Sequence, residues 1–344
     1  MLIAIAKEIT PLENRVALVP RHVAILKELG HRIAIQTNAG QDAGFNDEDY
    51  RAAGAEICAS PAQTYQNADI ILKIWAPLQG ETAYLSAGQK IICNAQNIKT
   101  TQAFKTLADR KIDLFALDLM PRLSRAQDMD ILSSQNNLAG YAAVLTGIQH
   151  CPSVMPLMIT SAGTLPPLKV LIMGLGVAGL QALATAHRLG AQLYALDNRP
   201  ETEEQAASLG AVFVHQLTDD LLSTVQLLIT SALITGKPAP KLLTAKQLGV
   251  LPPHCVIIDM AADSGGNIPT HALPQNITLI SDSHLARRVP TSASILYSGN
   301  VFNFFRFLYP NTDSSSVDFN DEIISTTAVC NHGQCHHPYL MTGK

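Results

Sequence analysis

A strand, a glycine-rich turn and a helix follow one another at residues 169–189 of this 344-residue chain. The strand is KVLIM, the turn at 174–179 is GLGVAG, and Asp197 ends the next apolar run 18 residues after Gly179. A G-x-G-x-x-G pattern in this setting is typical of a dinucleotide-binding βαβ unit. It constrains the fold strongly, because that unit requires parallel strands joined by a crossover helix.

Each glycine of the pattern has a physical role. We expect Gly174 to permit the tight turn, Gly176 to let a pyrophosphate approach the backbone, and Gly179 to let helix and strand pack closely. The first helical turn would present free N–H groups and a positive dipole end to the phosphates. The alternative is a glycine turn that holds no ligand.

The acidic residue at the end of the second strand predicts the choice of cofactor. Asp197 would accept hydrogen bonds from both ribose hydroxyls of an adenosine and would repel a 2′-phosphate, which favours NAD(H) over NADP(H). Arg199 lies close by in the sequence and would weaken that preference. The other cofactor-binding candidates are Val177, Ala178, Asn198, Ala232, Leu233 and Gly236.

Strand and helix patterns alternate through most of the chain, which predicts two doubly wound α/β domains with a ligand cleft between them. We expect the first domain at residues 1–133 plus about 304–330, and the Rossmann NAD(H)-binding domain at 134–303. Helical stretches at about 134–149 and 292–308 would connect them. A polar tail, 331–344, would follow a hairpin-like pair of short strands with Gly333 in the turn.

The composition excludes several classes of protein. Apolar residues make up 47% and charged residues 15%, so large cores are possible, and a net charge of −4 gives no nucleic-acid footprint. No apolar run is long enough for a membrane span or a signal peptide, and scattered cysteines favour a reducing compartment, so we expect a soluble cytoplasmic protein. The Cys and His residues of the tail match no common zinc spacing, and we expect no metal site.

The chain resembles two related families in several segments. The opening KEITPLENRVALVP, the glycine pattern, ALITGKPAPKLLT (232–244) and VIIDMAADSGGN (256–267) are similar to alanine dehydrogenase and to the alpha subunit of the proton-translocating NAD(P) transhydrogenase. The resemblance runs from residue 1 to about 330. It implies the two-domain fold, but the two families catalyse different reactions.

The residues that alanine dehydrogenase needs are missing here. Oxidation of an amino acid moves a proton as well as a hydride, and the resemblance implies a lysine and a histidine for that task. Trp75 stands where the lysine is expected, Lys73 lies two residues earlier, and no histidine occurs between His31 and His150. Arg15 and Asp263 match positions that alanine dehydrogenase uses. We interpret Trp75 as a packing aromatic.

Hydride exchange between two nicotinamides needs no acid–base pair, only rings held in contact. The loop PRLSRAQDMDILSSQ (121–135) resembles the transhydrogenase loop that holds the nicotinamide end of NAD(H), and AQN at 95–97 resembles a neighbouring segment. The resemblance assigns this site to Arg122, Gln127, Asp130 and Ser133. We expect Arg122 to pair with Asp130, Gln127 to reach a second nucleotide, and Arg125 and Asp128 to face solvent. The alternative is a solvated loop.

The transhydrogenase resemblance also implies partners. NADP(H) would bind a partner subunit, a membrane-integral subunit would conduct protons, and this component would form a homodimer of the Si-specific, proton-translocating type on the cytoplasmic face of the membrane. One departure is the short segment VFVHQLTDDLLSTVQ, where transhydrogenases carry a longer lid loop. Two alternatives remain: an amino-acid dehydrogenase, and an NAD-binding protein without catalytic activity.

Overall fold

The computed structural model describes the chain except for residues 97, 99, 235–236, 311–316 and 337–344. It divides into two compact units: Met1–Gln135 with Val289–Lys344, and Asn136–Arg288. Each unit contains one large sheet of mainly parallel strands, as the alternating pattern predicts. The second boundary differs from the expected 303–304, because the whole of helix α11 (Pro290–Leu308) lies in the first unit.

The sheet of the first unit has the strand order β16-β15-β6-β5-β4-β1-β2-β3. Strands β1 to β6 run parallel, and β15 joins the β6 edge in the antiparallel sense. The strands are β1 (Leu2–Ile5), β2 (Arg32–Gln36), β3 (Glu56–Cys58), β4 (Ile70–Trp75), β5 (Lys90–Asn94), β6 (Asp113–Ala116), β15 (Ala328–Asn331) and β16 (Gln334–Cys335).

Helices connect these parallel strands. They are α1 (Pro20–Glu28), α2 (Asp47–Ala52), α3 (Pro61–Tyr65), α4 (Gln79–Thr82) and α5 (Thr101–Asp109), with short 3-10 helices at Gln41–Ala43, Leu117–Leu119 and Ser124–Met129. Helix α1 begins at Pro20 and ends before Gly30, whose φ is 85°, as the sequence predicts.

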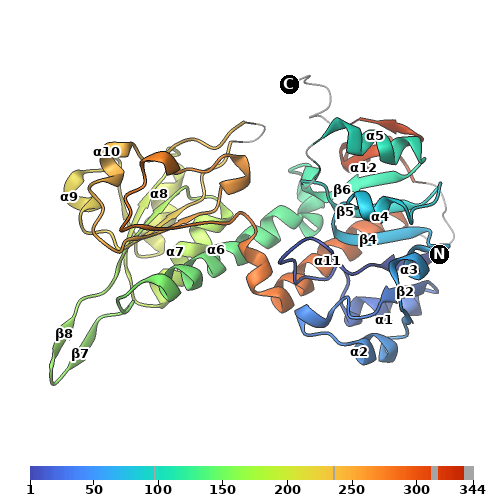
Figure 1. Cartoon of the computed structure of the whole chain (residues 1–344), viewed down its shortest axis with the longest axis horizontal. Helices are drawn as coiled ribbons and strands as arrows, with labels where there is room; N and C mark the ends of the chain where they lie inside the picture. The colour runs from blue at the N-terminus through green and yellow to red at the C-terminus, as the bar shows by residue number, and fades with distance from the viewer. Residues whose placement is uncertain (97, 99, 235–236, 311–316, 337–344) are drawn as a thin grey trace. The chain divides into compact units, whose positions relative to one another are not determined.

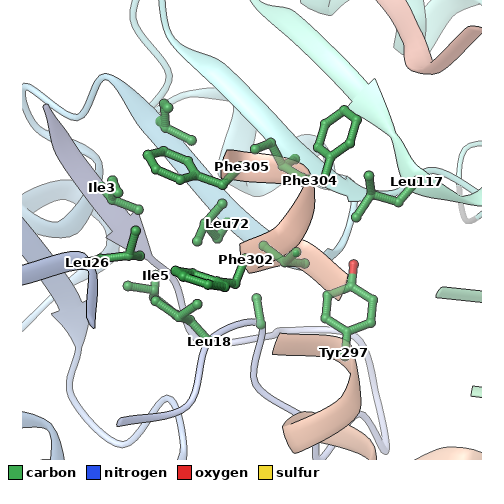
Figure 2. Close-up of a cluster of buried hydrophobic side chains, with 14 of the residues drawn as sticks. Ile3, Ile5, Leu18, Leu26, Leu72, Leu117, Tyr297, Phe302, Phe304 and Phe305 are labelled. Carbon is green, nitrogen blue, oxygen red and sulfur yellow. The ribbon is translucent and has the colours of Figure 1, made fainter. Parts of the chain in front are cut away.

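Alternating side chains of the strands enter two cores, one on each face of the sheet. Ile3 and Ile5 pack on the face covered by α1 and α11, and Ala4 packs on the face covered by α3 and α5. Figure 2 shows Phe302 and Phe305 of α11 directed toward the strand residues of the first core. Helix α11 therefore supplies much of this core from a distant part of the sequence.

The C-terminal part of the first unit matches the predicted hairpin only in its last strands. Strands β15 and β16 pair around His332 and Gly333, as expected. The preceding residues, expected as part of the first strand, instead form helix α12 (Glu322–Thr327). The Asp321 side chain accepts a hydrogen bond from the Ile323 backbone N–H, so an N-cap starts this helix despite its β-branched residues.

The sheet of the second unit has the order β11-β10-β9-β12-β13-β14, and all its strands are parallel. Numbered along the unit, this is the order 3-2-1-4-5-6 of dinucleotide-binding sheets, whose direction reverses between β9 and β12. The strands are β9 (Lys169–Met173), β10 (Gln192–Leu196), β11 (Val212–Phe213), β12 (Leu227–Thr230), β13 (Val256–Asp259) and β14 (Thr278–Ser281).

Helix α6 (Ile131–His150) begins in the first unit and continues into the second. The other helices of the second unit are α7 (Val177–Arg188), α8 (Glu201–Ser208), α9 (Asp219–Leu222) and α10 (Ala245–Leu248), with 3-10 helices at Ala262–Ser264, Thr270–Ala272 and Leu285–Arg288. Across the described part of the chain, none of the helices combines the length and apolar character that a membrane crossing requires.

An antiparallel hairpin of β7 (Met158–Thr160) and β8 (Gly163–Leu165) was not expected from the sequence. It projects from the body of its own unit (Figure 1), and its side chains are exposed. Ile159 at its centre is 75% exposed, and Leu157, Met158 and Leu165 are also exposed. The hairpin therefore carries apolar side chains that find no core among the described residues.

Candidate functional site

The glycine-rich turn has the geometry that the fingerprint predicts. Gly174 follows β9 with φ of 92°, and a Cβ there would lie 2.8 Å from the Ala232 backbone nitrogen. At Gly179 a Cβ would lie 1.9 Å from the Gly174 carbonyl oxygen. Both positions therefore exclude any side chain: the first because of its backbone conformation and close approach, the second because helix and turn are in contact.

The middle glycine is different, because a Cβ on Gly176 would meet nothing within 4 Å. Gly176 is the N-cap of α7, and its helix end receives no side-chain capping hydrogen bond. Val177 in the first turn is exposed, whereas Ala178 is buried. Open space in front of uncapped helical N–H groups suits the phosphates of a dinucleotide, so the residues fit the expected cofactor.

Asp197 is buried by its neighbours at the carboxyl end of β10. Its Oδ2 accepts hydrogen bonds from the Leu175 backbone N–H at 2.6 Å and from Nη2 of Arg199 at 2.9 Å. Its Oδ1 accepts from the backbone N–H and Nε of Arg199. Burial alone would raise the pKa of Asp197, but the hydrogen bonds from Arg199 and Leu175 lower it to about 2.

The pairing with Arg199 changes the role expected for Asp197. Four donors occupy the two carboxylate oxygens, which offer about four lone-pair sites. Ribose hydroxyls can bind there only if Arg199 withdraws, and the Arg199 side chain is half-exposed, so it has room to do so. Asn198, the residue between them, is only partly buried.

The two segments 232–244 and 256–267 are joined by a buried asparagine. Asn267 is fully buried, and its amide Nδ2 donates to the carbonyl oxygens of Ala232 and Pro240 at 2.9 and 2.8 Å. Asp259, at the end of β13, accepts from the backbone N–H of Asn267 at 2.7 Å. The candidate Ala232 is thus fixed beside Gly174, while Leu233 is exposed.

The expected cofactor residue Gly236 lies outside the described residues. The sequence reasoning missed the contribution of Asn267 and Asp259. Both lie in the segment VIIDMAADSGGN, where a carboxylate at a strand end was the available signal.

In the first unit, the loop 121–135 ends in a helix cap. Asp130 Oδ1 accepts from the Ser133 backbone N–H at 3.0 Å, and Asp130 Oδ2 accepts from the Ser133 hydroxyl at 2.5 Å. Asp130 therefore caps the start of α6. Within the described part of the chain, Arg122 makes no ion pair with Asp130, so the expected pairing of these two residues is wrong.

The same loop is tied to other elements of its unit. The Asp128 carbonyl oxygen accepts from Asn300 Nδ2 at 2.8 Å and from Asn303 Nδ2 at 3.2 Å, both on α11. Arg125 is exposed, as expected, but it also forms an ion pair with Asp321 at 2.6 Å. These contacts hold the loop in one conformation. Its exposed polar side chains include Arg122 and Gln127, and both remain available to a ligand.

Trp75 is buried, with only 4% of its surface exposed. Its indole Nε1 donates to Glu13 Oε2 at 2.7 Å, and the Arg15 guanidinium lies over its ring. Glu13 also accepts from Nε and Nη2 of Arg15, both at 2.7 Å. The aromatic residue therefore packs as expected and also joins a buried ion pair. Arg15 extends this network to Gln135, whose Oε1 accepts from Nη1 at 2.8 Å.

Lys73, on the same strand, is completely buried between two carboxylates. Its Nζ donates to Glu81 Oε1 at 2.7 Å and lies 3.3 Å from Glu8 Oε2. Burial would lower the pKa of Lys73, but Glu8 and Glu81 raise it above its usual value. An ammonium group held in this way cannot act as a base near neutral pH. The sequence reasoning missed this cluster, because residues 8, 73 and 81 meet only in the folded sheet.

Asp263 is held by a histidine of its own unit. His284 Nε2 lies 2.8 Å from Asp263 Oδ2, and the Asp263 backbone N–H donates to the Ser283 hydroxyl at 3.0 Å. The family pattern drew attention to Asp263, but it did not indicate His284. Among the described residues, no group of three or more His, Cys, Asp or Glu side chains could hold a metal ion.

Comparison with protein families gives matches over both halves of the chain. The model "Alanine dehydrogenase/PNT, N-terminal domain" matches residues 4–139, and "Alanine dehydrogenase/PNT, C-terminal domain" matches residues 143–338. The chain is 37% identical to the first of the chains that make up NAD(P) transhydrogenase subunit alpha in Rhodospirillum rubrum, with 100% of each chain covered. That alignment spans 387 positions, so it includes positions for which this shorter chain has no residue.

A second relative is alanine dehydrogenase 2 of Staphylococcus aureus, 32% identical over 78% of this chain and 74% of the relative. Among solved structures, the transhydrogenase from Sinorhizobium meliloti has a TM-score of 0.90 at 37% identity, covering 98% of this chain and 100% of that one. An L-alanine dehydrogenase has a TM-score of 0.87 at 24% identity, covering 99% and 98%, which shows that the fold is shared.

Proposed function

The chain belongs to the alanine dehydrogenase/PNT family as a relative of its NAD(P) transhydrogenase alpha subunits, and from this premise we propose that it is the NAD(H)-binding component of a proton-translocating NAD(P)⁺ transhydrogenase. In this function, hydride passes directly between NADH held by this chain and NADP⁺ held by a partner subunit. The chain contributes binding and positioning, and it acts as an enzyme only with its partners.

The observation that carries this proposal is the state of the residues around Trp75. Trp75 takes the place of the lysine that alanine dehydrogenase chemistry requires, and its indole is bound to Glu13. The nearest lysine, Lys73, is neutralised by two carboxylates and shielded from solvent. Direct hydride exchange needs no general acid or base, so it is the family reaction compatible with these residues.

In the second unit, the proposed cofactor-holding residues surround the start of α7. Gly174, Gly176 and Gly179 shape the turn that receives the phosphates, and Val177 and Ala178 form the first helical turn. The proposed adenosine end lies at the carboxyl end of β10, at Asp197, Asn198 and Arg199. Ala232 and Leu233 follow β12, across the reversal of strand order, where doubly wound sheets bind their ligands.

In the first unit, the proposed nicotinamide-holding residues divide into two groups. Asp130 and Ser133 bind each other, so we propose that they position the loop. Arg122 and Gln127 are exposed, so we propose that they contact nucleotides. Gln127 both donates and accepts hydrogen bonds, which suits a residue that bridges to a nucleotide on another chain.

The proposed function requires further subunits. The chain carries one glycine fingerprint, at 174–179, so NADP(H) would bind a partner subunit. Proton movement would belong to a membrane-integral subunit, and this chain would lie at the cytoplasmic face of the inner membrane through its partners. The R. rubrum relative is named as one portion of an alpha subunit, which agrees with an enzyme divided among several chains.

We also propose that this component forms a homodimer through the β7–β8 hairpin. An isolated two-stranded hairpin with exposed apolar side chains is marginal in water and has open backbone edges. Ile159→Asp is expected to shift the chain toward monomer in sedimentation experiments. Leu12→Asp is the matched control, because Leu12 is similarly exposed but lies in the first unit. Equal dimer content in both variants would reject the hairpin as the contact.

The function is tested with deuterium at C4 of NADH and the complex reconstituted from this chain and its partner subunits. Each of the two C4 faces is labelled in turn, in ordinary water. We expect NADPH to carry the full label from one face and none from the other, since direct transfer exchanges nothing with solvent. Loss of that label to water would contradict direct transfer. Omission of the NADP(H)-binding subunit is the control and should abolish transfer.

The alternatives predict different outcomes. NADH oxidation that depends on ammonia and pyruvate, catalysed by this chain alone, would establish an amino-acid dehydrogenase. Failure of the chain to bind NADH would contradict the proposal. NADH binding without any transfer in the complete complex would leave a non-catalytic NAD-binding protein. The short connection 212–226 forms β11 and α9, so we propose that the longer lid of other transhydrogenases is reduced here.

A further inference from the structure

Two cysteines lie directly opposite each other in the C-terminal hairpin. The hairpin turns at His332 and Gly333, whose φ angles are 48° and 77°. Two successive residues with positive φ form the type I′ loop that matches the twist of paired strands. The loop fixes the register, so that Cys330 pairs with Cys335.

The hydrogen bonds identify the kind of pair that Cys330 and Cys335 form. The His336 backbone N–H donates to the Val329 carbonyl oxygen at 2.8 Å, so those two residues are a hydrogen-bonded pair. Hydrogen-bonded and non-hydrogen-bonded pairs alternate along antiparallel strands, which makes Cys330 and Cys335 a non-hydrogen-bonded pair. Its Cα atoms are typically about 4.5 Å apart, within the range that a disulfide spans.

The side chains also point toward each other. The Sγ atoms of Cys330 and Cys335 are 3.0 Å apart, and both lie near the Phe104 carbonyl oxygen of α5, at 3.7 and 3.1 Å. His332 does not complete a metal site with them, because its ring packs against Phe319. Two thiols in contact, without a third ligand among the described residues, suit a covalent bond better than a metal ion.

We propose that Cys330 and Cys335 form a reversible disulfide, which makes the C-terminal hairpin a redox-modification site. The oxidant is a small-molecule disulfide such as oxidised glutathione. Cys335 is partly exposed and reacts first: its thiolate attacks one sulfur of the oxidant and releases one thiolate. The buried Cys330 then attacks the Cys335 sulfur and releases the second thiolate. Both protein thiol protons end on the two released small thiols.

The surroundings of the thiols set the rate of this exchange. Burial raises the pKa of both thiols, and for Cys335 the hydrogen bonds from its neighbours only partly offset this effect. The thiolate is the reactive form, so exchange is slow near pH 7 and accelerates roughly tenfold per pH unit until the pKa is reached. The bond closes a loop of only about six residues, so its effect is local: it holds β16 to β15 at the sheet edge.

The test uses the full chain in glutathione buffers of stepped oxidised-to-reduced ratio at pH 7 and pH 8. Samples are quenched with acid, alkylated with N-ethylmaleimide and analysed by intact mass and peptide mapping. We expect a species with two fewer alkyl groups and a linked peptide that contains Cys330 and Cys335, formed roughly tenfold faster at pH 8. Cys335→Ser should abolish this species, and Cys58→Ser should leave it unchanged.

A further variant leaves both cysteines in place. Gly333→Val puts a β-branched residue at φ of 77°, although the space around Gly333 is open enough for a Cβ. The strained turn should separate the two thiols and shift the half-oxidation point by several-fold toward more oxidising buffer. The proposal is overturned if both cysteines remain fully alkylated in oxidised glutathione, if Cys335 carries only glutathione, or if Gly333→Val oxidises as the unmodified chain does.

Discussion

The Trp75 indole nitrogen donates a hydrogen bond to Oε2 of Glu13, and the two atoms are 2.7 Å apart. Glu13 also binds Arg15 through both carboxylate oxygens, so the three side chains form one buried unit. An arginine held in this way is not available to bind the carboxylate of an amino-acid substrate. Burial would raise the pKa of Glu13, but Arg15 and Trp75 lower it, so the ion pair stays charged near neutral pH.

We therefore expect no alanine dehydrogenation by this chain at any pH between about 6 and 10, the range in which a catalytic lysine or histidine would titrate. Trp75→Lys, which places a lysine at the expected position, is also expected to be inactive, because no histidine occurs between His31 and His150. The measurement is a steady-state assay with alanine and NAD⁺. Turnover in the ordinary enzyme range of about 1–10³ s⁻¹ by either protein would overturn this interpretation of the site.

A second prediction concerns the pH dependence of stability at Glu8. Burial raises the pKa of Glu8 from 4.5 to about 7, although Lys73 and the Ile74 backbone N–H oppose the shift. Because the folded pKa lies above the unfolded one, the neutral carboxyl contributes stability that is present below pH 4.5 and is lost as pH rises toward 7. Glu8→Gln keeps a neutral group of the same shape and removes this titration.

Thermal unfolding of both proteins from about pH 4.5 to about pH 8 measures the effect. The stability of the unmodified chain minus that of Glu8→Gln should decrease from pH 4.5 to about 7 and then stay constant. Asp42→Asn, a change at an exposed carboxyl group, is the control and should show no such trend. A difference that increases with pH would mean that Glu8 is ionised and stabilised by Lys73.

The glycines of the nucleotide turn give a matched pair of variants. Gly179→Ala places a methyl group 1.9 Å from the Gly174 carbonyl oxygen, so helix and turn must separate. We expect a loss of about 2–4 kcal/mol of unfolding free energy, as for other overpacked or strained sites. Gly176→Ala meets no atom within 4 Å and should change stability by less than about 1 kcal/mol.

Binding should reverse this ranking relative to stability. Gly176→Ala should weaken NADH binding at least tenfold in a well-folded protein, because the methyl group occupies the space where the pyrophosphate approaches. Denaturant unfolding and NADH titration of both variants separate the two effects. If Gly176→Ala binds NADH normally, the phosphates do not lie at this helix end, and the proposed cofactor site is wrong.

The agreement between sequence and structure is best where a local pattern defines the geometry. The turn at Gly174 and the contact at Gly179 follow from the spacing of the glycines, because each position allows no side chain. The cap formed by Asp130 and Ser133 is also encoded locally, since an acidic residue three positions before a serine is compatible with an N-cap. The family resemblance favours an ion pair of Asp130 with Arg122 instead, which is why the cap was not expected.

Contacts between distant residues were beyond sequence reasoning. Glu8, Lys73 and Glu81 come from three separate elements, and their meeting depends on the pairing of β1 with β4. The sequence placed Arg199 near Asp197, but periodicity cannot show that its guanidinium would occupy the carboxylate. Side-chain partners of this kind depend on rotamers and packing, which an apolar–polar pattern does not specify.

The Asp197–Arg199 pair predicts opposite effects of two substitutions on cofactor choice. Asp197→Ala removes the hydroxyl acceptor and frees Arg199, so NADH affinity should fall about tenfold while NADPH affinity rises. Arg199→Ala leaves Asp197 free to accept the ribose hydroxyls, so the preference for NADH should increase. Titrations of both cofactors measure the two ratios. Equal affinity of the unmodified chain for NADH and NADPH would contradict the assignment of Asp197.

The last prediction separates the two exposed residues of the loop 121–135. Gln127→Asn keeps the amide but shortens its reach by one methylene group. NADH binding to the isolated chain should change little, while hydride transfer in the reconstituted complex should fall by about 100-fold, because small displacement of reacting groups is costly. Arg122→Ala should instead weaken NADH binding itself, through loss of a charged donor rather than through any effect on Asp130, which is held by Ser133. Arg125→Ala is the control, since Arg125 binds Asp321. NADH affinity and transfer rate are measured for all three variants. If Gln127→Asn leaves transfer unchanged, or if Gln127 and Arg122 variants lose only binding, the loop acts as a simple clamp and no residue in it bridges to the second nucleotide.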